Sequence, residues 1–492
     1  MLTELVFILG WLSAGMLSLH AAGLRGWELV PVGFIVGASG YVAIAALTLI
    51  AAVPQLPVVA LTLLLGMSGL WWLRNVPTAA ARATLLVRAA VALPATAAVV
   101  AAARSARLVN YHFDSLEHAA NTAMIATGRL TYTNTAYVQF RGIGFPLLHS
   151  PAPLVGDLYL ASVGPLLALS TLGVLVWFTS TAAPCDANSR RTLLVGLVGA
   201  LVLLTTNRVV FHAFYLHGHM ITAATMLVLV AAGWAYALGT RPSLHRAFLM
   251  MQVTVLPALV LARPEAIAVA ALAITPTLIS PRIARGHRIA VASTYAAAAI
   301  APQLFFIAEG YRVAGGPHQN TVALLILGLG TAGIAVLLAL RDQTPTTERA
   351  WLRIAYLAIA AAAGGATYVA PEIMATSIRA LWGNIAQGGG GWGSSFLLLA
   401  ALLVVVLVVT ELPQRHHLVF PILTFIPAAL LFALARDGAY RVNPADSLNR
   451  MLLHILPLAV LVLTSTIVAG SNRWAGAHQP NVESGATPPQ RV

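Results

Sequence analysis

The sequence contains no lysine, and all 28 of its basic residues are arginine. This absence excludes lysine chemistry such as Schiff-base formation and the phosphate-loop lysine of NTPases. A single cysteine, Cys185, permits neither an intrachain disulfide nor a cysteine metal cluster. Charged residues are also scarce, at 9%, whereas a soluble domain carries about 25%. The scarcity of charge argues against a soluble protein.

Hydrophobic residues make up 59% of the 492 residues, and mean hydropathy is +0.84. Apolar stretches of about 20 residues, enough to cross a bilayer, recur along the chain. Backbone groups in lipid must be satisfied within the segment, so we read each stretch as a helix. The first stretch, 5–22, is expected to be a retained helix because it lacks a basic leader and a cleavage site.

We therefore predict an all-α, polytopic transmembrane helical bundle of about 13–15 spans. The candidate spans are 3–22, 29–52, 56–73, 85–103, 156–178, 192–206, 219–238, 247–262, 265–281, 289–308, 320–340, 353–370, 394–410, 418–435 and 451–470. In the 247–281 pair, Pro257 and Pro264 predict a kinked or re-entrant arrangement.

Arginine placement predicts the orientation, since short cytoplasmic loops of membrane proteins are rich in Arg and Lys. We take loop 74–88 as cytoplasmic because it holds three arginines. Alternation then places six further segments on the same side: 179–191, 239–246, 282–288, 341–353, 411–417 and the tail. The N-terminus is predicted outside and the C-terminus inside. Because the arginines are dispersed among short loops, nucleic-acid binding is not expected.

Four regions follow from this topology. Residues 1–103 are N-terminal transmembrane helices, 104–155 an external catalytic loop with an interfacial helix, 156–470 a transmembrane core with external loops 371–393 and 436–450, and 471–492 a disordered cytoplasmic tail. Long loops in a compact chain are usually functional. We find no internal repeat, which disfavours an inverted-repeat transporter.

A polar stripe lies in the first external loop, where Asp114, Glu117, His118 and Asn121 are spaced i, i+3, i+4 and i+7. On a helix they share one face. Two carboxylates and an imidazole at the membrane mouth suit proton transfer at a hydroxyl nucleophile. The alternative is a solvated amphipathic helix at the interface.

The next external segment contains Arg208 and the spacing H-x4-H-x-H at His212, His217 and His219. Three histidines could bind a metal if folded together. A groove for a lipid phosphate headgroup is at least as well supported, and we predict no cofactor and no metal site.

Arginines recur at two further span ends. Arg263 either pairs locally with Glu265 or contacts phosphate through its guanidinium fork. The last external segment holds Arg441, Arg450 and His454, where the alternative is snorkelling anchorage. Together, five or six cationic or titratable side chains near one membrane face suit an anionic, membrane-held substrate.

These segments resemble the GT-C superfamily of membrane glycosyltransferases. "HFDSLEHAANTAMIATGRL" resembles that family's first long external loop, with Asp114 in the place of the family's acid. "FPLLHSPAPL" resembles the stretch that leads from this loop back into the membrane. "LARPEA" and "NRMLLHILPLAV" are similar to later arginine segments that face the lipid-phosphate site. The resemblance covers about 104–470. The helices before it resemble the extension of an uncharacterised GT-C-like group from high-GC bacteria.

The resemblance implies inverting sugar transfer from a polyprenyl-phosphate donor to a cell-envelope glycan or lipid acceptor. It places the reaction on the external (periplasmic) face of a bacterial plasma membrane, among membrane lipids. Asp114 would be the base, and Glu117 and His118 share its stripe, although Ser115 stands where a second acid is common. The residues expected to bind the donor phosphate are Arg208, His219, Arg263, Arg441, Arg450 and His454.

Three other functions stay open. A polysaccharide or lipid transporter would show polar residues at mid-membrane and an internal repeat. A polymerase or ligase of lipid-linked glycans would carry its long loop late in the chain. A non-catalytic membrane scaffold would leave the Asp114 stripe unexplained.

Overall fold

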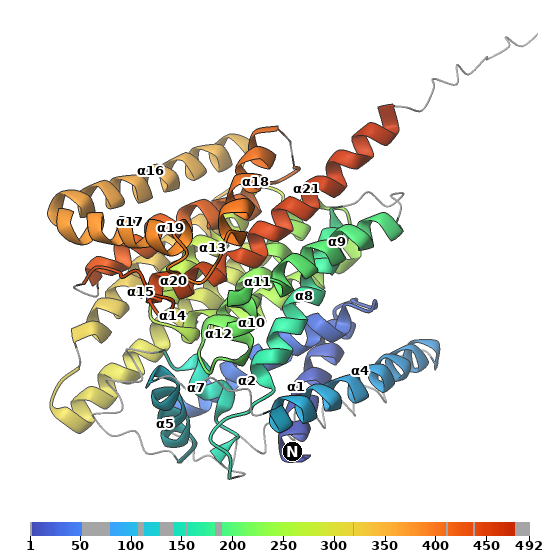
Figure 1. Cartoon of the computed structure of the whole chain (residues 1–492), viewed down its shortest axis with the longest axis horizontal. Helices are drawn as coiled ribbons and strands as arrows, with labels where there is room; N and C mark the ends of the chain where they lie inside the picture. Colours follow the sequence, from blue (N-terminus) through green and yellow to red (C-terminus); the bar gives the residue numbers. More distant parts are fainter. Residues whose placement is uncertain are drawn as a thin grey trace, which may run out of the picture.

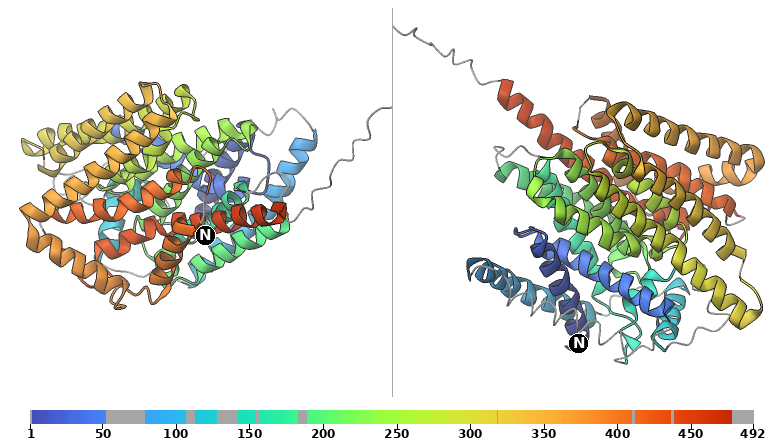
Figure 2. Two further views of the ribbon diagram at one scale, coloured as in Figure 1. Left: turned by 90° about the horizontal axis from the view of Figure 1, so that it is seen from above. Right: turned by 180° about the vertical axis from the view of Figure 1, so that it is seen from behind.

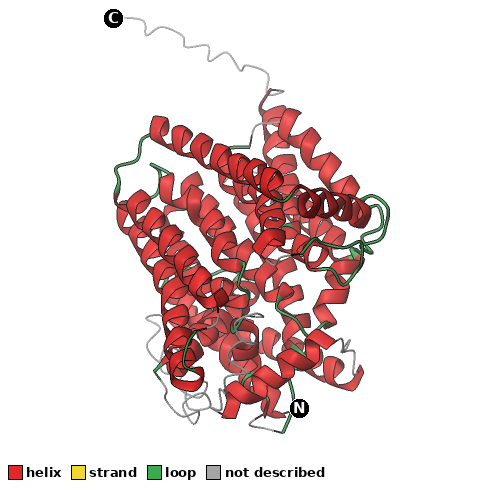
Figure 3. Ribbon diagram, turned by 90° about the vertical axis from the view of Figure 1, so that its left-hand side faces the viewer, coloured by secondary structure: helices red, strands yellow, loops and turns green. Residues whose placement is uncertain are grey.

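The computed structural model describes residues 2–51, 79–106, 113–127, 142–153, 156–182, 189–317, 319–409, 412–435 and 438–477. Every regular element in these ranges is a helix (Figure 3). Ten of the helices are long and apolar enough to cross a membrane, or 11 if one bent pair counts as a span. The predicted all-α polytopic bundle is thereby confirmed.

From α8 onward, most of the described helices follow one another with short connections (Figure 1). The first half comprises α1 (Leu2–Ala21), α2 (Leu29–Ile50), α4 (Ala79–Ala106), α5 (Phe113–Thr127), α7 (Gly144–His149), α8 (Val163–Thr181), α9 (Ser189–Leu204), α10 (Asn207–Phe214), α11 (His219–Leu238), η2 (Pro242–Leu244) and α12 (His245–Ala262). The second half comprises α13 (Ala266–Ile279), α14 (Arg285–Ala314), α15 (Gln319–Leu340), α16 (Pro345–Val369), α17 (Pro371–Ile385), α18 (Ser395–Val409), α19 (His416–Ala435), α20 (Ser447–Met451), η3 (Leu452–His454) and α21 (Leu456–Ala477).

Fewer helices have spanning length than the sequence predicted. The stretch predicted at 85–103 lies within the 28-residue helix α4, whereas those predicted at 265–281 and 394–410 correspond to apolar helices of 14 and 15 residues. At 1.5 Å per residue such helices fall short of a hydrocarbon core of about 30 Å. The span predicted at 192–206 belongs to the bent pair α9–α10, whose axes differ by 71°. The span predicted at 56–73 lies outside the described residues.

The break between α12 and α13 has a local cause. A residue before proline is driven out of the helical region by the proline ring. Arg263 precedes Pro264 and is extended, with φ −157° and ψ 153°, so α12 ends at Ala262. Pro257 stays inside α12. The prediction that this pair is interrupted by proline is therefore right, and the interruption falls at Pro264.

Helix α11 forms the centre of the bundle and is almost entirely buried. It packs against α2, α8, α12, α13, α19 and α21. Helix α16 is instead largely exposed and runs along the outside, in contact with α13, α17 and α19 (Figure 2). Its exposed apolar side chains, such as Leu357, suit contact with lipid.

The short arginine-containing connections gather at one end of the bundle. Arg288 Nη1 donates to the carbonyls of Leu278 and Arg341, at 3.3 and 3.2 Å. Trp234 Nε1 donates to the carbonyl of Pro413 at 3.1 Å. We call this the arginine-loop end; it comprises 239–246, 282–288, 341–348 and 412–417. Helices α5, α7, α10 and α20 lie at the opposite end.

The structure adds helix to two of the predicted regions. Residues Pro371–Ile385, expected within an external loop, form helix α17. Proline at its first position and Glu372 in its first turn both favour helix initiation. The tail, expected to be disordered from residue 471, continues as helix to Ala477 because α21 extends beyond its apolar part.

A buried ion network fastens the N-terminal helix to the rest of the chain. Glu4 is fully buried and accepts hydrogen bonds from Arg104 Nη1 at 2.7 Å and from the backbone N and Oγ of Ser162. Arg104 also forms two hydrogen bonds with Asp157, at 2.9 and 3.1 Å. This network joins α1, α4 and the segment before α8.

Candidate functional site

Eight basic or imidazole side chains from five parts of the chain meet at the end opposite the arginine-loop end. They come from α5, from α10 and the turn after it, from the start of α11, from the α12–α13 junction, and from α20–η3. We call them the histidine–arginine cluster: His118, Arg208, His212, His217, His219, Arg263, Arg450 and His454.

Glycines allow the chain to close around Arg263. Gly142 has φ +83°, and a Cβ there would lie 2.6 Å from the Ala262 carbonyl oxygen. A Cβ on Gly218 would lie 3.3 Å from the same oxygen. Both positions therefore favour glycine, for its conformation at Gly142 and for its size at both. The close approach places His217 and His219 beside the extended Arg263.

A chain of hydrogen bonds runs through the cluster. Arg263 Nη1 lies 3.1 Å from His219 Nε2, and His219 Nδ1 lies 3.0 Å from His454 Nε2. A guanidinium only donates, so neutral His219 accepts at Nε2 and carries its proton on Nδ1. His219 then donates to His454, whose proton is on Nδ1. His454 Nδ1 is buried and has no hydrogen-bond partner among the described residues. This series of hydrogen bonds therefore ends at the Nδ1–H group of His454, which is a donor.

The rings of the cluster are packed together. His217 stacks on His219 with ring centroids 4.3 Å apart, and His118 meets His217 edge-on at 4.7 Å. Arg450 Nη1 donates to Tyr215 Oη at 3.1 Å, and the Tyr215 ring stacks on His217 at 5.5 Å. His217 therefore lies between α5 and the segment that carries Arg450.

The electrostatics of the cluster are dominated by positive charge. Burial holds the pKa of His217 well below its usual value, and the charges of Arg450, His118, Arg263 and His212 lower it further. Arg208 and Arg450 are both buried, and their charges repel each other. Arg263 is partly neutralised by an ion pair from its Nε to Glu265 Oε1. A site of this kind favours an anionic ligand.

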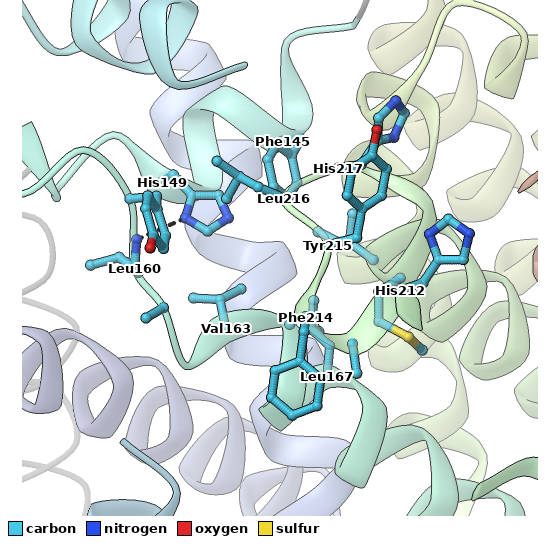
Figure 4. Close-up of a pocket in the computed structure, with 16 residues that line it drawn as sticks. Phe145, His149, Leu160, Val163, Leu167, His212, Phe214, Tyr215, Leu216 and His217 are labelled. Carbon is cyan, nitrogen blue, oxygen red and sulfur yellow. Dashed lines mark hydrogen bonds between the residues drawn. The ribbon is translucent and has the colours of Figure 1, made fainter. Parts of the chain in front are cut away.

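An apolar pocket adjoins the cluster (Figure 4). His149 lies on one side of it and His212 on the other, with Phe145, Leu167 and Phe214 between them. The backbone N of Leu160 donates to His149 Nδ1 at 3.0 Å. Burial lowers the pKa of His149 to about 3, so its imidazole is neutral.

A second pocket includes Arg263 in its lining. Its other lining residues are mostly apolar, among them Val260, Ile267 and Phe306, with Gln303 as a polar member. The cationic cluster is thus in contact with two largely apolar pockets. This combination suits a ligand with an anionic group attached to apolar chains.

Asparagines hold segments 371–393 and 436–450 against the cluster. Asn384 Nδ2 donates to the carbonyl of Arg441, and Asn449 Nδ2 donates to that of Gly390, each at 2.9 Å. A Cβ on Gly390 would lie 2.4 Å from Asn449 Oδ1. The adjacent Gly391, at φ +73°, passes close to the side chain of Arg208. The two glycines therefore allow the backbone of this segment to lie close to Asn449 and Arg208, which are neighbours of Arg450.

The residues predicted to bind phosphate are mostly brought together. Arg208, His219, Arg263, Arg450 and His454 all belong to the cluster. Arg441 does not: it is exposed, its amide donates to Asp446 Oδ1 and its carbonyl accepts from Asn384.

The predicted catalytic stripe lies on α5. His118 is fully buried against His217, and Glu117 is partly buried. Asp114 is in the first turn of α5, one turn before His118, and its side chain lies outside the described residues. Nothing in the described contacts assigns Asp114 a role.

Four residues of the site and its pocket were not among the site residues predicted from the sequence: His149, His212, Tyr215 and His217. The H-x4-H-x-H spacing was the sequence pattern that could have identified the histidines. It was interpreted as a metal or headgroup motif, without the residues from other helices that contact it. In the structure both ring nitrogens of His219 are hydrogen-bonded, to Arg263 and His454. A metal bound by His212, His217 and His219 together would have to break one of these bonds, so the arrangement favours an anion over a cation.

Comparison with protein-family models, with curated proteins and with solved structures found no match to this chain. The function is therefore inferred from the chemistry of the cluster and from the resemblance of the loops to the GT-C superfamily.

Proposed function

We propose that this chain is a membrane glycosyltransferase of GT-C type that uses a polyprenyl-phosphate sugar as donor. The observation that carries the proposal is the buried histidine–arginine cluster in contact with two apolar pockets. The planar guanidinium groups of Arg263 and Arg450 match the geometry of phosphate oxygens. The apolar lining of the two pockets matches an isoprenoid chain in chemical character, and a bound phosphate offsets the repulsion between Arg208 and Arg450.

In this proposal the cluster stabilises the departing phosphate. The bond between the anomeric carbon and the phosphate oxygen breaks, and its electron pair stays on the lipid phosphate. Arg450 and the N–H of His454 donate hydrogen bonds to that oxygen as negative charge develops. Arg263 fixes the tautomer of His219 and hence that of His454. Arg263 therefore acts on the leaving group partly through two imidazoles.

Asp114 is the proposed general base. It takes the proton of the acceptor hydroxyl as the hydroxyl oxygen forms its bond to the anomeric carbon, on the face opposite the phosphate. Inversion of configuration follows. The packing of His118 against His217 supports this assignment, because it places α5 against the cluster.

We place the reaction on the external face of a bacterial plasma membrane, with a cell-envelope glycan or lipid as acceptor. The support is the separation of the cluster from the arginine-loop end. Helices of about 20 residues separate ends by about 30 Å, and arginine-rich loops are typically cytoplasmic.

Binding of a short-chain polyprenyl phosphate to purified protein in detergent tests the anion site. Arg450→Ala should weaken binding about 10- to 150-fold, as expected for loss of a charged hydrogen bond of about 1.5–3 kcal/mol. Arg379→Ala is the matched control, since Arg379 is exposed on α17 and bonds only to its own helix among the described residues. Equal affinities for wild type and Arg450→Ala would refute the site.

A further inference from the structure

A second group of metal-ligating side chains lies at the arginine-loop end, away from the histidine–arginine cluster. It consists of Glu348 in the first turn of α16 and of His416 and His417, which begin α19. One ligand atom from each residue lies within 4.8 Å of the others. His416 Nε2 is 3.0 Å from Glu348 Oε1, and the two histidine rings are 4.6 Å apart.

These contacts do not explain why the side chain of His417 is buried. Its side chain is buried, with 2% exposure, and its Nε2 has no hydrogen-bond partner among the described residues. Leaving a buried polar nitrogen unsatisfied costs about 1–3 kcal/mol. A ligand that accepts the lone pair of an imidazole nitrogen would remove that cost.

We propose that Glu348, His416 and His417 bind a divalent transition-metal ion, with Zn²⁺ as the first candidate. Two imidazoles and one carboxylate form a ligand set that zinc uses with a water as fourth ligand. Imidazole donors favour Zn²⁺, Cu²⁺ or Ni²⁺ over Mg²⁺ and Ca²⁺. Ligand atoms around tetrahedral zinc lie about 3.4 Å apart, so side-chain rotations that bring these atoms closer by up to about 1.4 Å would close the site.

The charges around the group limit its affinity. Glu348 supplies one negative charge, and both histidines bind a metal only in their neutral form. The positive charge of Arg282 lies near His417 and opposes a bound cation. We therefore expect weaker binding than at structural zinc sites with four protein ligands.

A metal at this position would fasten α16 to the bundle. Helix α16 is the least buried of the spanning helices, and one of its main contacts is with α19. Its first turn is already fixed by a capping box, in which Thr344 and Thr347 exchange side chain–backbone hydrogen bonds. Glu348 therefore has a defined position from which to reach the two histidines.

The test is zinc binding to full-length protein purified in detergent and stripped with EDTA. Calorimetric titration with ZnCl₂ should give one site per chain, and Co²⁺ in its place should give the visible absorption of tetrahedral cobalt. Zinc at 100 times its Kd should raise the ratio of folded to unfolded protein about 100-fold, measured as a rise in Tm.

Variants locate the ion. Glu348→Gln and His417→Ala should each lose the site and the Tm rise, whereas His245→Ala, a histidine at the same end that stacks on Tyr236, should retain both. If His417→Ala does not fold, Glu348→Gln decides, because it preserves size. Zinc binding of unchanged stoichiometry and affinity in Glu348→Gln, or no binding by the wild type, would overturn the proposal. Binding lost only in His219→Ala would place the metal in the histidine–arginine cluster and would equally overturn it.

Discussion

His219 Nδ1 lies 3.0 Å from His454 Nε2, which joins the first residue of α11 to the turn before α21 across 235 positions of sequence. Because Arg263 donates to the other nitrogen of His219, the tautomers of both imidazoles follow from one guanidinium. The position of the Arg263 guanidinium thus determines, through His219, which nitrogen of His454 carries the proton. This relationship links the arrangement of the cluster to its proposed role toward phosphate.

The N–H of His454 is expected to contribute to donor binding. His454→Leu removes it and should weaken binding of polyprenyl phosphate by about 2- to 13-fold, the loss expected for a neutral hydrogen bond of about 0.5–1.5 kcal/mol. His454→Asn, whose amide can donate from the same position, should recover most of that affinity. Calorimetric titration measures both. Equal loss in the two variants would indicate a packing role for His454.

Asp114→Asn separates base catalysis from donor binding. The substitution keeps size and hydrogen bonding and removes basicity, so turnover should fall by about 10²- to 10⁴-fold. Donor affinity should be unchanged, because the carboxylate acts on the acceptor. Glu117→Gln should have a milder effect. Transfer at the wild-type rate by Asp114→Asn would exclude the proposed mechanism.

Acid should destabilise the protein through its buried histidines. Burial lowers the pKa of His149 to about 3 and that of His217 well below its usual value. Below about pH 6.5 the unfolded chain protonates these residues while the folded chain does not. The stability that these neutral histidines contribute above pH 6.5 is therefore lost as the pH falls. The contribution of His149 to the free energy of unfolding decreases until about pH 3.

Each such histidine changes stability by about 1.4 kcal/mol per pH unit in this range. His149→Asn retains an acceptor for the Leu160 amide and removes the titration, so the decline of Tm between pH 6.5 and 5 should become shallower. Tryptophan fluorescence during heating in detergent measures the slope. An unchanged slope would show that His149 does not contribute.

The Glu4 network should be important for stability. Glu4→Ala leaves the Ser162 amide without its acceptor and removes one of two carboxylates that bind Arg104. Leaving a buried amide without its acceptor costs about 1–3 kcal/mol. The unfolding temperature should therefore drop markedly, whereas Glu372→Ala, an exposed acid on α17, should leave it close to wild type.

Topology can be tested on a background in which Cys185 is replaced by serine. Cysteine at Leu116, which is 57% exposed on α5, and at Gly286, where a Cβ meets open space, should react with an impermeant thiol reagent from opposite sides. Ser115 is unsuitable because it is fully buried. Labelling of both positions from one side would refute the proposed orientation.

The sequence predicted most of the bundle because bilayer spans are defined by composition and length. It missed helix α17, whose Glu372, Arg379 and Asn384 made the segment resemble a polar loop. It also identified Arg263 and Arg450 as candidates for one site, since both stand at span ends of the same predicted side. The contact of His217 with His118 and the tautomer of His454 depend on residues more than 40 positions apart in sequence, which periodicity and spacing do not reveal.

Sugar transfer by the reconstituted wild-type protein tests the central claim most directly. Liposomes containing the protein would be supplied with radiolabelled polyprenyl-phosphate sugars and a cell-envelope glycan extract, and transfer would be followed together with release of polyprenyl phosphate. The account predicts transfer from at least one such donor, with inverted configuration in the product, and its loss in Arg450→Ala but not in Arg379→Ala. No transfer from any donor, together with movement of a labelled lipid across the bilayer, would contradict the enzyme proposal and favour a transporter.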